Sequence, residues 1–273
     1  MKKGIAAFII VLFLMPLGHA LMVLNEVLLP DSKFLGAGAI GFLGLIAVYI
    51  GVKQNEKRSL ASVLGLLGAV FVWTGWVEFS FVWIAEKLDV LPYVVDGEVA
   101  TKPEYLVMLS SVGLLFTVIL FYLFTRTNCT FFVWIQRIAG LKDGTMSKQK
   151  VDRPLSIIAF MESVIIIWFF YIVLLFVYDP EILGDRHPLT YVVAYGSLIW
   201  SMYLMAKLLK IKTFDYAIRY AIPTVIIFWN FVEILGRWGM FKEFWVHPFE
   251  HWIELSIITL TTTGFIVYFL KSE

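Results

Sequence analysis

Histidine and glutamate side chains at the start of the last apolar stretch have the types and spacing of a metal site. A helix that begins at Pro248 would place His247, His251 and Glu254 along one stripe of its surface. Two imidazoles four residues apart on a helix can bind one metal ion, and a carboxylate can complete the ligand set. With ligands from the first apolar stretch added, the predicted metal ligands are His19, Glu26, His247, His251 and Glu254.

A mixture of imidazole and carboxylate ligands suits zinc or iron, and also copper where histidines are numerous. Such an ion would activate water or oxygen, and a nearby glutamate would act as a base or proton carrier. Glu78 and Glu233 are ionisable residues inside other apolar stretches, so we predict that they are catalytic. Asn230 and Arg237 share a helix face with Glu233, at spacings of three and four residues.

Eight apolar stretches must position these side chains. Crossing a hydrocarbon core of about 30 Å takes roughly 20 helical residues, and each stretch is about that long. The loops between them are short, so we predict one all-α domain over residues 1–273, a multi-pass helical membrane bundle. The predicted spans cover about residues 5–29, 35–52, 60–85, 105–125, 155–178, 189–206, 217–236 and 248–270.

The composition supports this class. Hydrophobic residues make up 60% of the sequence and charged residues 16%, against about 45–50% and about 25% in soluble domains. The net charge of +1 provides no basic surface for nucleic acid, so we predict no nucleic-acid partner. The predicted partners are the lipid bilayer and a lipid-soluble or small apolar substrate.

The basic residues predict an orientation. Most of the 22 Lys and Arg residues fall on one side of the predicted bundle, which indicates that both termini lie inside a plasma (inner) membrane. Glu162 then lies in the inner third of the membrane. The ionisable side chains that lie near the outer face are His19, Glu26, Glu78, Glu233, His247, His251 and Glu254.

Three further features are local. An aromatic-rich segment at residues 131–141 is predicted to form a short helix in the inner interface. Residues 76–79 resemble residues 231–234, which suggests a weak repeat of four helices plus four. The single cysteine, Cys129, is predicted to have no special chemistry.

Several functions remain open at this stage. The first hypothesis is a membrane metalloenzyme with its His/Glu site near the outer face, which oxidises or reduces a lipid-soluble or small apolar substrate. The second is a proton- or cation-coupled transporter in which Glu26, Glu78, Glu162 and Glu233 mark the route. The third is a non-catalytic subunit that associates with other membrane subunits. A purely structural interpretation also exists, in which Glu233 and Arg237 neutralise each other and His247 caps a helix.

Overall fold

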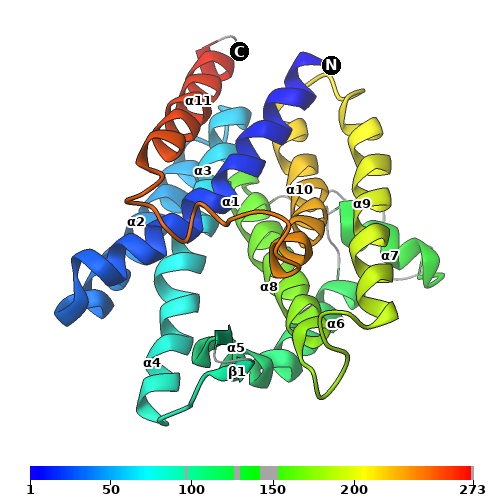
Figure 1. Ribbon diagram of the computed structural model, residues 1–273. Helices are drawn as coiled ribbons and strands as arrows, with labels where there is room; N and C mark the ends of the chain where they lie inside the picture. Colours follow the sequence, from blue (N-terminus) through cyan, green and yellow to red (C-terminus); the bar gives the residue numbers. More distant parts are fainter. Residues whose placement is uncertain (96–97, 126–129, 142–152, 272–273) are drawn as a thin grey trace.

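The computed structural model describes residues 1–95, 98–125, 130–141 and 153–271. In these ranges, eight helical segments are long and apolar enough to cross a membrane, which confirms the predicted all-α bundle. Figure 1 shows both chain termini at the top of the bundle. The helices, in chain order, are α1 (Lys2–Leu28), α2 (Lys33–Lys53), α3 (Arg58–Val72), α4 (Phe79–Lys87), α5 (Pro103–Met108), α6 (Val112–Phe124), α7 (Thr130–Ile138), α8 (Leu155–Tyr178), α9 (Pro188–Leu208), α10 (Phe214–Arg237) and α11 (Trp252–Lys271).

A short β-hairpin, which the sequence analysis did not predict, lies at the other end of the bundle. Strands β1 (Tyr93–Val95) and β2 (Glu98–Thr101) pair in antiparallel fashion, with Tyr93 opposite Thr101. Figure 1 shows the hairpin at the bottom, between α4 and α5. We call the two ends of the molecule the termini end and the hairpin end.

The third spanning segment contains a π-helical turn, Trp73–Glu78, which joins α3 to α4. Trp76 Nε1 donates a hydrogen bond to the carbonyl oxygen of Gly38 in α2, at 3.1 Å. The backbones of the two segments touch here, because a Cβ atom on Gly75 would collide with the backbone of Gly41. The π turn is therefore held directly against α2.

The last helix begins later than predicted. α11 starts at Trp252, whereas the predicted stripe required a start at Pro248. Residues 243–251 form successive turns instead, in which His247 N donates to Phe244 O at 3.3 Å and Glu250 N donates to His247 O at 3.1 Å. His247 and Glu254 consequently do not lie on one continuous helix.

Aliphatic side chains fill the half of the bundle near the termini end. Ile10 of α1, together with Ile218 and Ile222 of α10, is fully buried. Phe214, at the start of α10, stacks on Phe269 near the end of α11, with ring centroids 4.8 Å apart. The named side chains therefore belong to a tightly packed apolar core in this half.

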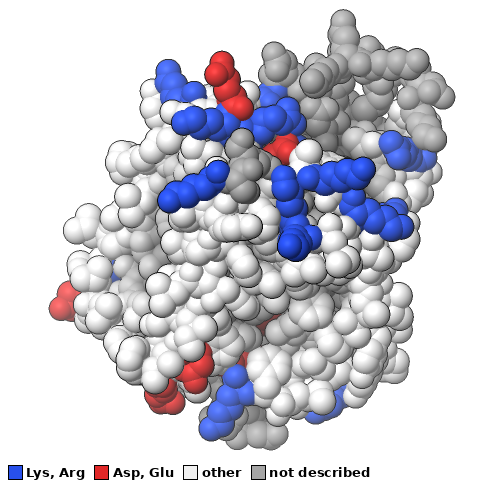
Figure 2. Space-filling model, turned by 90° about the horizontal axis from the view of Figure 1, so that it is seen from above, with Lys and Arg blue, Asp and Glu red and all other residues white. Residues whose placement is uncertain are grey.

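Basic residues gather at the surface of the same end. Figure 2, which views the molecule from the termini end, shows Lys and Arg side chains collected over part of this face. Among them, Arg58 Nη2 lies 3.0 Å from Asp215 Oδ2, and this ion pair joins the start of α3 to the start of α10. The inside location of the termini stays a prediction. Cys129 and several of the basic residues on which that prediction rests (Arg126, Lys142, Lys148 and Lys150) lie outside the described residues.

A helix, α7 (Thr130–Ile138), overlaps the segment 131–141 in which a short helix was predicted, and its place in the membrane interface stays a prediction. Gln136 Nε2 donates to the carbonyl oxygens of Tyr122 and Leu123, at 3.1 Å each. These carbonyls lie in the last turn of α6 and lack a partner within that helix, so Gln136 caps α6. Trp134 packs against Trp200 of α9, with ring centroids 5.7 Å apart.

Candidate functional site

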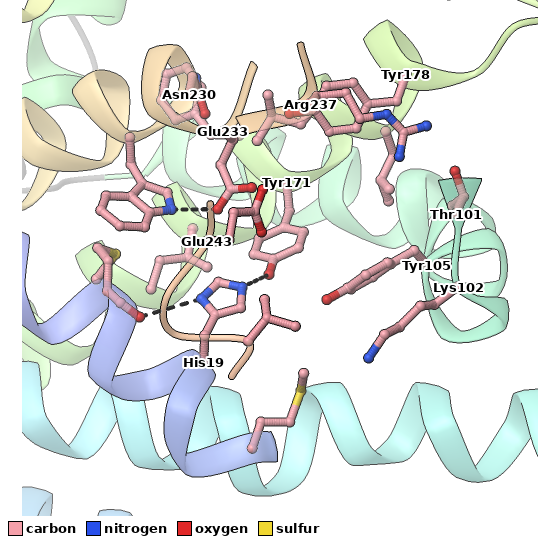
Figure 3. A pocket seen from close by; sticks show the side chains of 18 of the residues that line it. His19, Thr101, Lys102, Tyr105, Tyr171, Tyr178, Asn230, Glu233, Arg237 and Glu243 are labelled. Carbon is pink, nitrogen blue, oxygen red and sulfur yellow. Dashed lines mark hydrogen bonds between the residues drawn. The ribbon is translucent and has the colours of Figure 1, made fainter. Parts of the chain in front are cut away.

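A cavity of about 300 Å³ lies between α1, α5, α8 and α10 toward the hairpin end (Figure 3). The link from β2 to α5 and the loop from α10 to α11 complete its wall. Much of that wall is apolar, with side chains that include Met15 and Met22 of α1 and Ile167, Leu174 and Leu175 of α8. An apolar cavity with a few convergent polar groups is the usual form of a small-molecule site.

A line of hydrogen bonds leads into the wall of this cavity. Glu78, of which 4% is exposed, accepts a hydrogen bond from Trp73 Nε1 at 3.0 Å. The hydroxyl group of Tyr171 in α8 lies 3.3 Å from Glu78 Oε1 and 3.0 Å from His19 Nε2. His19 Nδ1 faces the carbonyl oxygen of Met15 at 3.4 Å, which is long for a hydrogen bond.

Two arrangements of protons fit this geometry. In the first, Glu78 holds a proton and donates it to Tyr171, Tyr171 donates to His19 Nε2, and His19 Nδ1 carries the ring proton. In the second, the Nδ1 proton has left, His19 Nε2 donates to Tyr171, and Tyr171 donates to Glu78. The two arrangements differ by one proton. The line can therefore hold a proton at Glu78 and deliver one at His19 Nδ1. Of the two ring nitrogens of His19, Nδ1 makes the longer contact, 3.4 Å against 3.0 Å for Nε2.

The helices explain why His19 faces this line. Ala20, the next residue in α1, packs against Trp245 and Leu255, so this face of α1 is turned toward α11. Successive helical residues point about 100° apart, which turns His19 toward Tyr171 of α8. α1 packs against both α10 and α11, but its histidine belongs to the cavity.

Glu233 and Asn230 form a second polar region on the wall, one turn apart in α10 (Figure 3). Trp229 Nε1 donates to Glu233 Oε1 at 2.6 Å. Asn230 is 2% exposed, and its Nδ2 has no hydrogen-bond partner among the described residues. An unpaired buried amide costs free energy, which makes Asn230 unusual in a folded protein.

Glu243, in the loop after α10, brings another carboxyl group to the same region. Gly236 leaves the room for it, because a Cβ atom there would collide with Glu243 Oε1. Burial and the neighbouring Glu233 carboxyl raise the pKa of Glu243, while His19 and Arg237 act in the opposite direction. The cavity is therefore bordered by two carboxyl groups that come from different elements.

Among the described residues, no ion pair joins Glu233 to Arg237, contrary to one interpretation of the sequence. Arg237 Nε lies 3.1 Å from both carboxylate oxygens of Asp185, which belongs to the loop between α8 and α9. The guanidinium group also lies over the ring of Tyr178, 5.1 Å from its centroid. Lys102, which also lines the wall, has Nζ 3.8 Å from Glu104 Oε1.

The predicted metal ligands are dispersed. His247 and Glu254 are exposed, and His251 Nδ1 lies 3.4 Å from Glu254 Oε1. Within the described ranges, no group of three or more His, Cys, Asp or Glu side chains is arranged to hold a metal ion. The side chains present do not fit such a site, so we derive no chemistry through zinc, iron or copper.

The remaining predicted residues lie away from the cavity. Glu26 borders a separate charged depression at the hairpin end, together with Lys33, Glu86 and Lys102. Lys102 belongs to both walls, so the depression and the cavity adjoin each other. Glu162 is buried within α8.

Sequence reasoning missed the tyrosines of the site. Tyr171 and Tyr178 are seven residues apart in α8, so they share one face of an otherwise apolar helix, and both line the cavity with Tyr105 of α5. That spacing was the available signal. Glu243 carried none, because its position depends on the path of a loop.

Comparisons with known proteins give no family for this chain. No protein-family model, curated protein or solved structure matches it. The functional argument therefore rests on the cavity and the residues around it.

Proposed function

We propose that the protein is a membrane enzyme that binds a small lipid-soluble molecule in the cavity and exchanges a proton with it through His19. The observation that carries this proposal is the line of hydrogen bonds from Glu78 through Tyr171 to His19, which ends at the cavity wall. A general acid or base must lie within reach of its substrate, and His19 meets that requirement for a molecule in the cavity.

Each residue has a defined part in the proton transfer. When a bound molecule takes the proton from His19 Nδ1, the ring accepts a proton from Tyr171 at Nε2, and Tyr171 accepts one from Glu78. The net result is a proton moved from Glu78 to the substrate, with Glu78 left as a carboxylate. The reverse sequence removes a proton from the substrate. Trp73 Nε1 stabilises the carboxylate form, because it donates to Glu78 Oε1.

The proposal places the cavity near the outer face of the plasma (inner) membrane, with the bilayer supplying a lipid-soluble substrate. The support for this orientation is the distribution of basic residues in the sequence. Oxidation or reduction of the substrate stays a prediction, and so does association with other membrane subunits.

Proton-coupled transport is a second candidate, because the charged depression adjoins the cavity at Lys102 and provides an approach from the hairpin end. A route between α1 and α10 to the other end would have to pass Ile10, Ile218 and Ile222, which are fully buried. Transport along that route would therefore require these side chains to move apart.

A coloured phenol tests binding and proton exchange together. The probe is 2-hexyl-4-nitrophenol, which reports its ionisation by absorbance, added to the full-length protein in lipid nanodiscs. We expect the bound probe to ionise at a different pH from probe in empty nanodiscs. Tyr171→Phe breaks the line of hydrogen bonds and should move that pH by about one unit. Tyr268→Phe, at an exposed position in α11, is the matched control and should leave it unchanged.

Occupancy of the cavity is tested by filling it. Val23 of α1 lines the cavity and is half-buried, so Val23→Trp should displace the probe. Leu24, the next residue, is also half-buried but does not line the cavity, so Leu24→Trp should still bind it. Equal binding by these two variants, or an unchanged ionisation pH in Tyr171→Phe, would overturn the proposal.

A further inference from the structure

The basic and acidic residues that line the cavity differ in whether they form ion pairs. The Arg and Lys residues on the wall have acidic partners beyond it: Arg237 pairs with Asp185, and Lys102 lies near Glu104. The two acidic residues on the wall, Glu233 and Glu243, form no ion pair with any described residue. This leaves two carboxyl groups facing one partly enclosed space.

Aromatic rings surround that space. Tyr105 of α5, Phe170 and Tyr171 of α8, and Trp229 of α10 all line the cavity. The faces of such rings attract cations, and a cage of aromatic rings with nearby carboxylates is the usual means of binding an organic ammonium group. The wall therefore combines two features that favour positive charge over negative charge.

Asn230 supplies an independent indication that the protein does not complete this site by itself. Its side chain lies on the wall beside Glu233, is 2% exposed, and has an amide nitrogen with no hydrogen-bond partner in the described part of the chain. Rotation of the amide by 180° presents either its oxygen or its nitrogen to the cavity. It can thus accept a hydrogen bond from an ammonium group, or donate one to a neighbouring hydroxyl group.

We infer that the ligand of this cavity is an amphiphilic amine, with its ammonium group between Glu233 and Glu243 and its hydrocarbon part among the apolar side chains of α1 and α8. The ammonium group supplies the close ion-pair partner that the two acids lack among the described residues. Met15, Met22 and Leu174 provide the apolar surface for the hydrocarbon part. The inference rests on the proposed function, because it specifies what occupies the same cavity.

Four probes with the same eight-carbon chain test this inference: n-octylamine, octyltrimethylammonium, n-octanol and n-octanoate. Binding is measured by equilibrium dialysis against the full-length protein in zwitterionic nanodiscs, with empty nanodiscs as the partition control. We expect n-octylamine to bind at least about tenfold more tightly than n-octanol, and n-octanoate to bind most weakly. Strong binding of octyltrimethylammonium as well would show that the aromatic rings contribute, because that head group has no N–H donor.

Two variants locate the ammonium group. Glu233→Gln and Glu243→Gln should each weaken n-octylamine binding at least about tenfold and leave n-octanol binding unchanged. Glu250→Gln, at an exposed position in the same loop as Glu243, is the matched control and should change neither. Retained n-octanol binding also shows that each variant is folded.

The outcomes separate the two proposals. If n-octanol and n-octylamine bind equally, or if the glutamine variants bind n-octylamine as the wild type does, the amine inference is wrong and the cavity remains a binding site. If no probe binds, or if Val23→Trp leaves all binding unchanged, the proposed function fails together with it.

Discussion

The two halves of the bundle are built from the same helices but are packed differently. Near the termini end, α1 and α10 meet through fully buried aliphatic side chains such as Ile10 and Ile222. Toward the hairpin end, the same two helices present His19, Asn230 and Glu233 to a cavity. Apolar side chains fill space without directional requirements, whereas each buried polar group requires a partner at a fixed distance. The first half therefore provides stability, and the second holds the polar groups on which the proposed chemistry depends.

The largest effect in this comparison is expected from a substitution in the half near the termini end. Ile222→Ala should lower the free energy of unfolding by about 2 kcal/mol, because it leaves a cavity among side chains that cannot close around it. Binding of n-octanol should not change, since Ile222 does not line the cavity. Unfolding in detergent and equilibrium dialysis measure the two quantities. A loss of binding without a loss of stability would contradict the division between the halves.

An opposite and smaller effect on the free energy of unfolding is expected in the half that contains the cavity. Asn230→Leu removes an amide whose nitrogen has no hydrogen-bond partner among the residues that the structure describes, so it should raise the free energy of unfolding by about 1 kcal/mol. Asn25→Leu is the control: Asn25 is also buried, but its Nδ2 donates to Lys33 O at 2.8 Å. That variant should be destabilised by about 1 kcal/mol. If both variants shift stability in the same direction, the unpaired amide of Asn230 is not the cause.

The sequence was sufficient to predict the helices because an apolar run of this length has few alternatives in a membrane. Glu78, Glu233 and His19 could be identified for the same reason, since ionisable residues are costly in such runs. Their neighbours could not be identified. The pairing of His19 with Tyr171, rather than with His251, depends on how α1 is turned between α8 and α11, and an apolar sequence carries little information about that rotation.

The smallest expected effect is a pH dependence of stability that comes from Glu243, in the loop that borders the cavity. Burial and Glu233 raise the pKa of Glu243, and Arg237 and His19 oppose this. Above the ordinary pKa of 4.5, the folded protein therefore keeps a proton that the unfolded chain releases. Stability should fall as the pH rises from 4.5 through the raised pKa. Glu243→Gln lacks this loss, so its unfolding temperature relative to the wild type should increase between pH 5 and pH 8. A constant difference would show that Glu243 titrates normally.

The π turn also has a consequence for the helical phase of the third spanning segment. Its buried row advances by three or four residues at each step, except for one step of five residues between Trp73 and Glu78; the row is Ser62, Leu66, Ala69, Trp73, Glu78, Val82 and Ala85. The π turn thus corresponds to an α-helix with one extra residue inserted between Trp73 and Glu78. Deletion of Thr74 would turn that five-residue step into an ordinary four-residue one. The acid would keep its place in the row, and the segment would lose the widened turn that rests on α2.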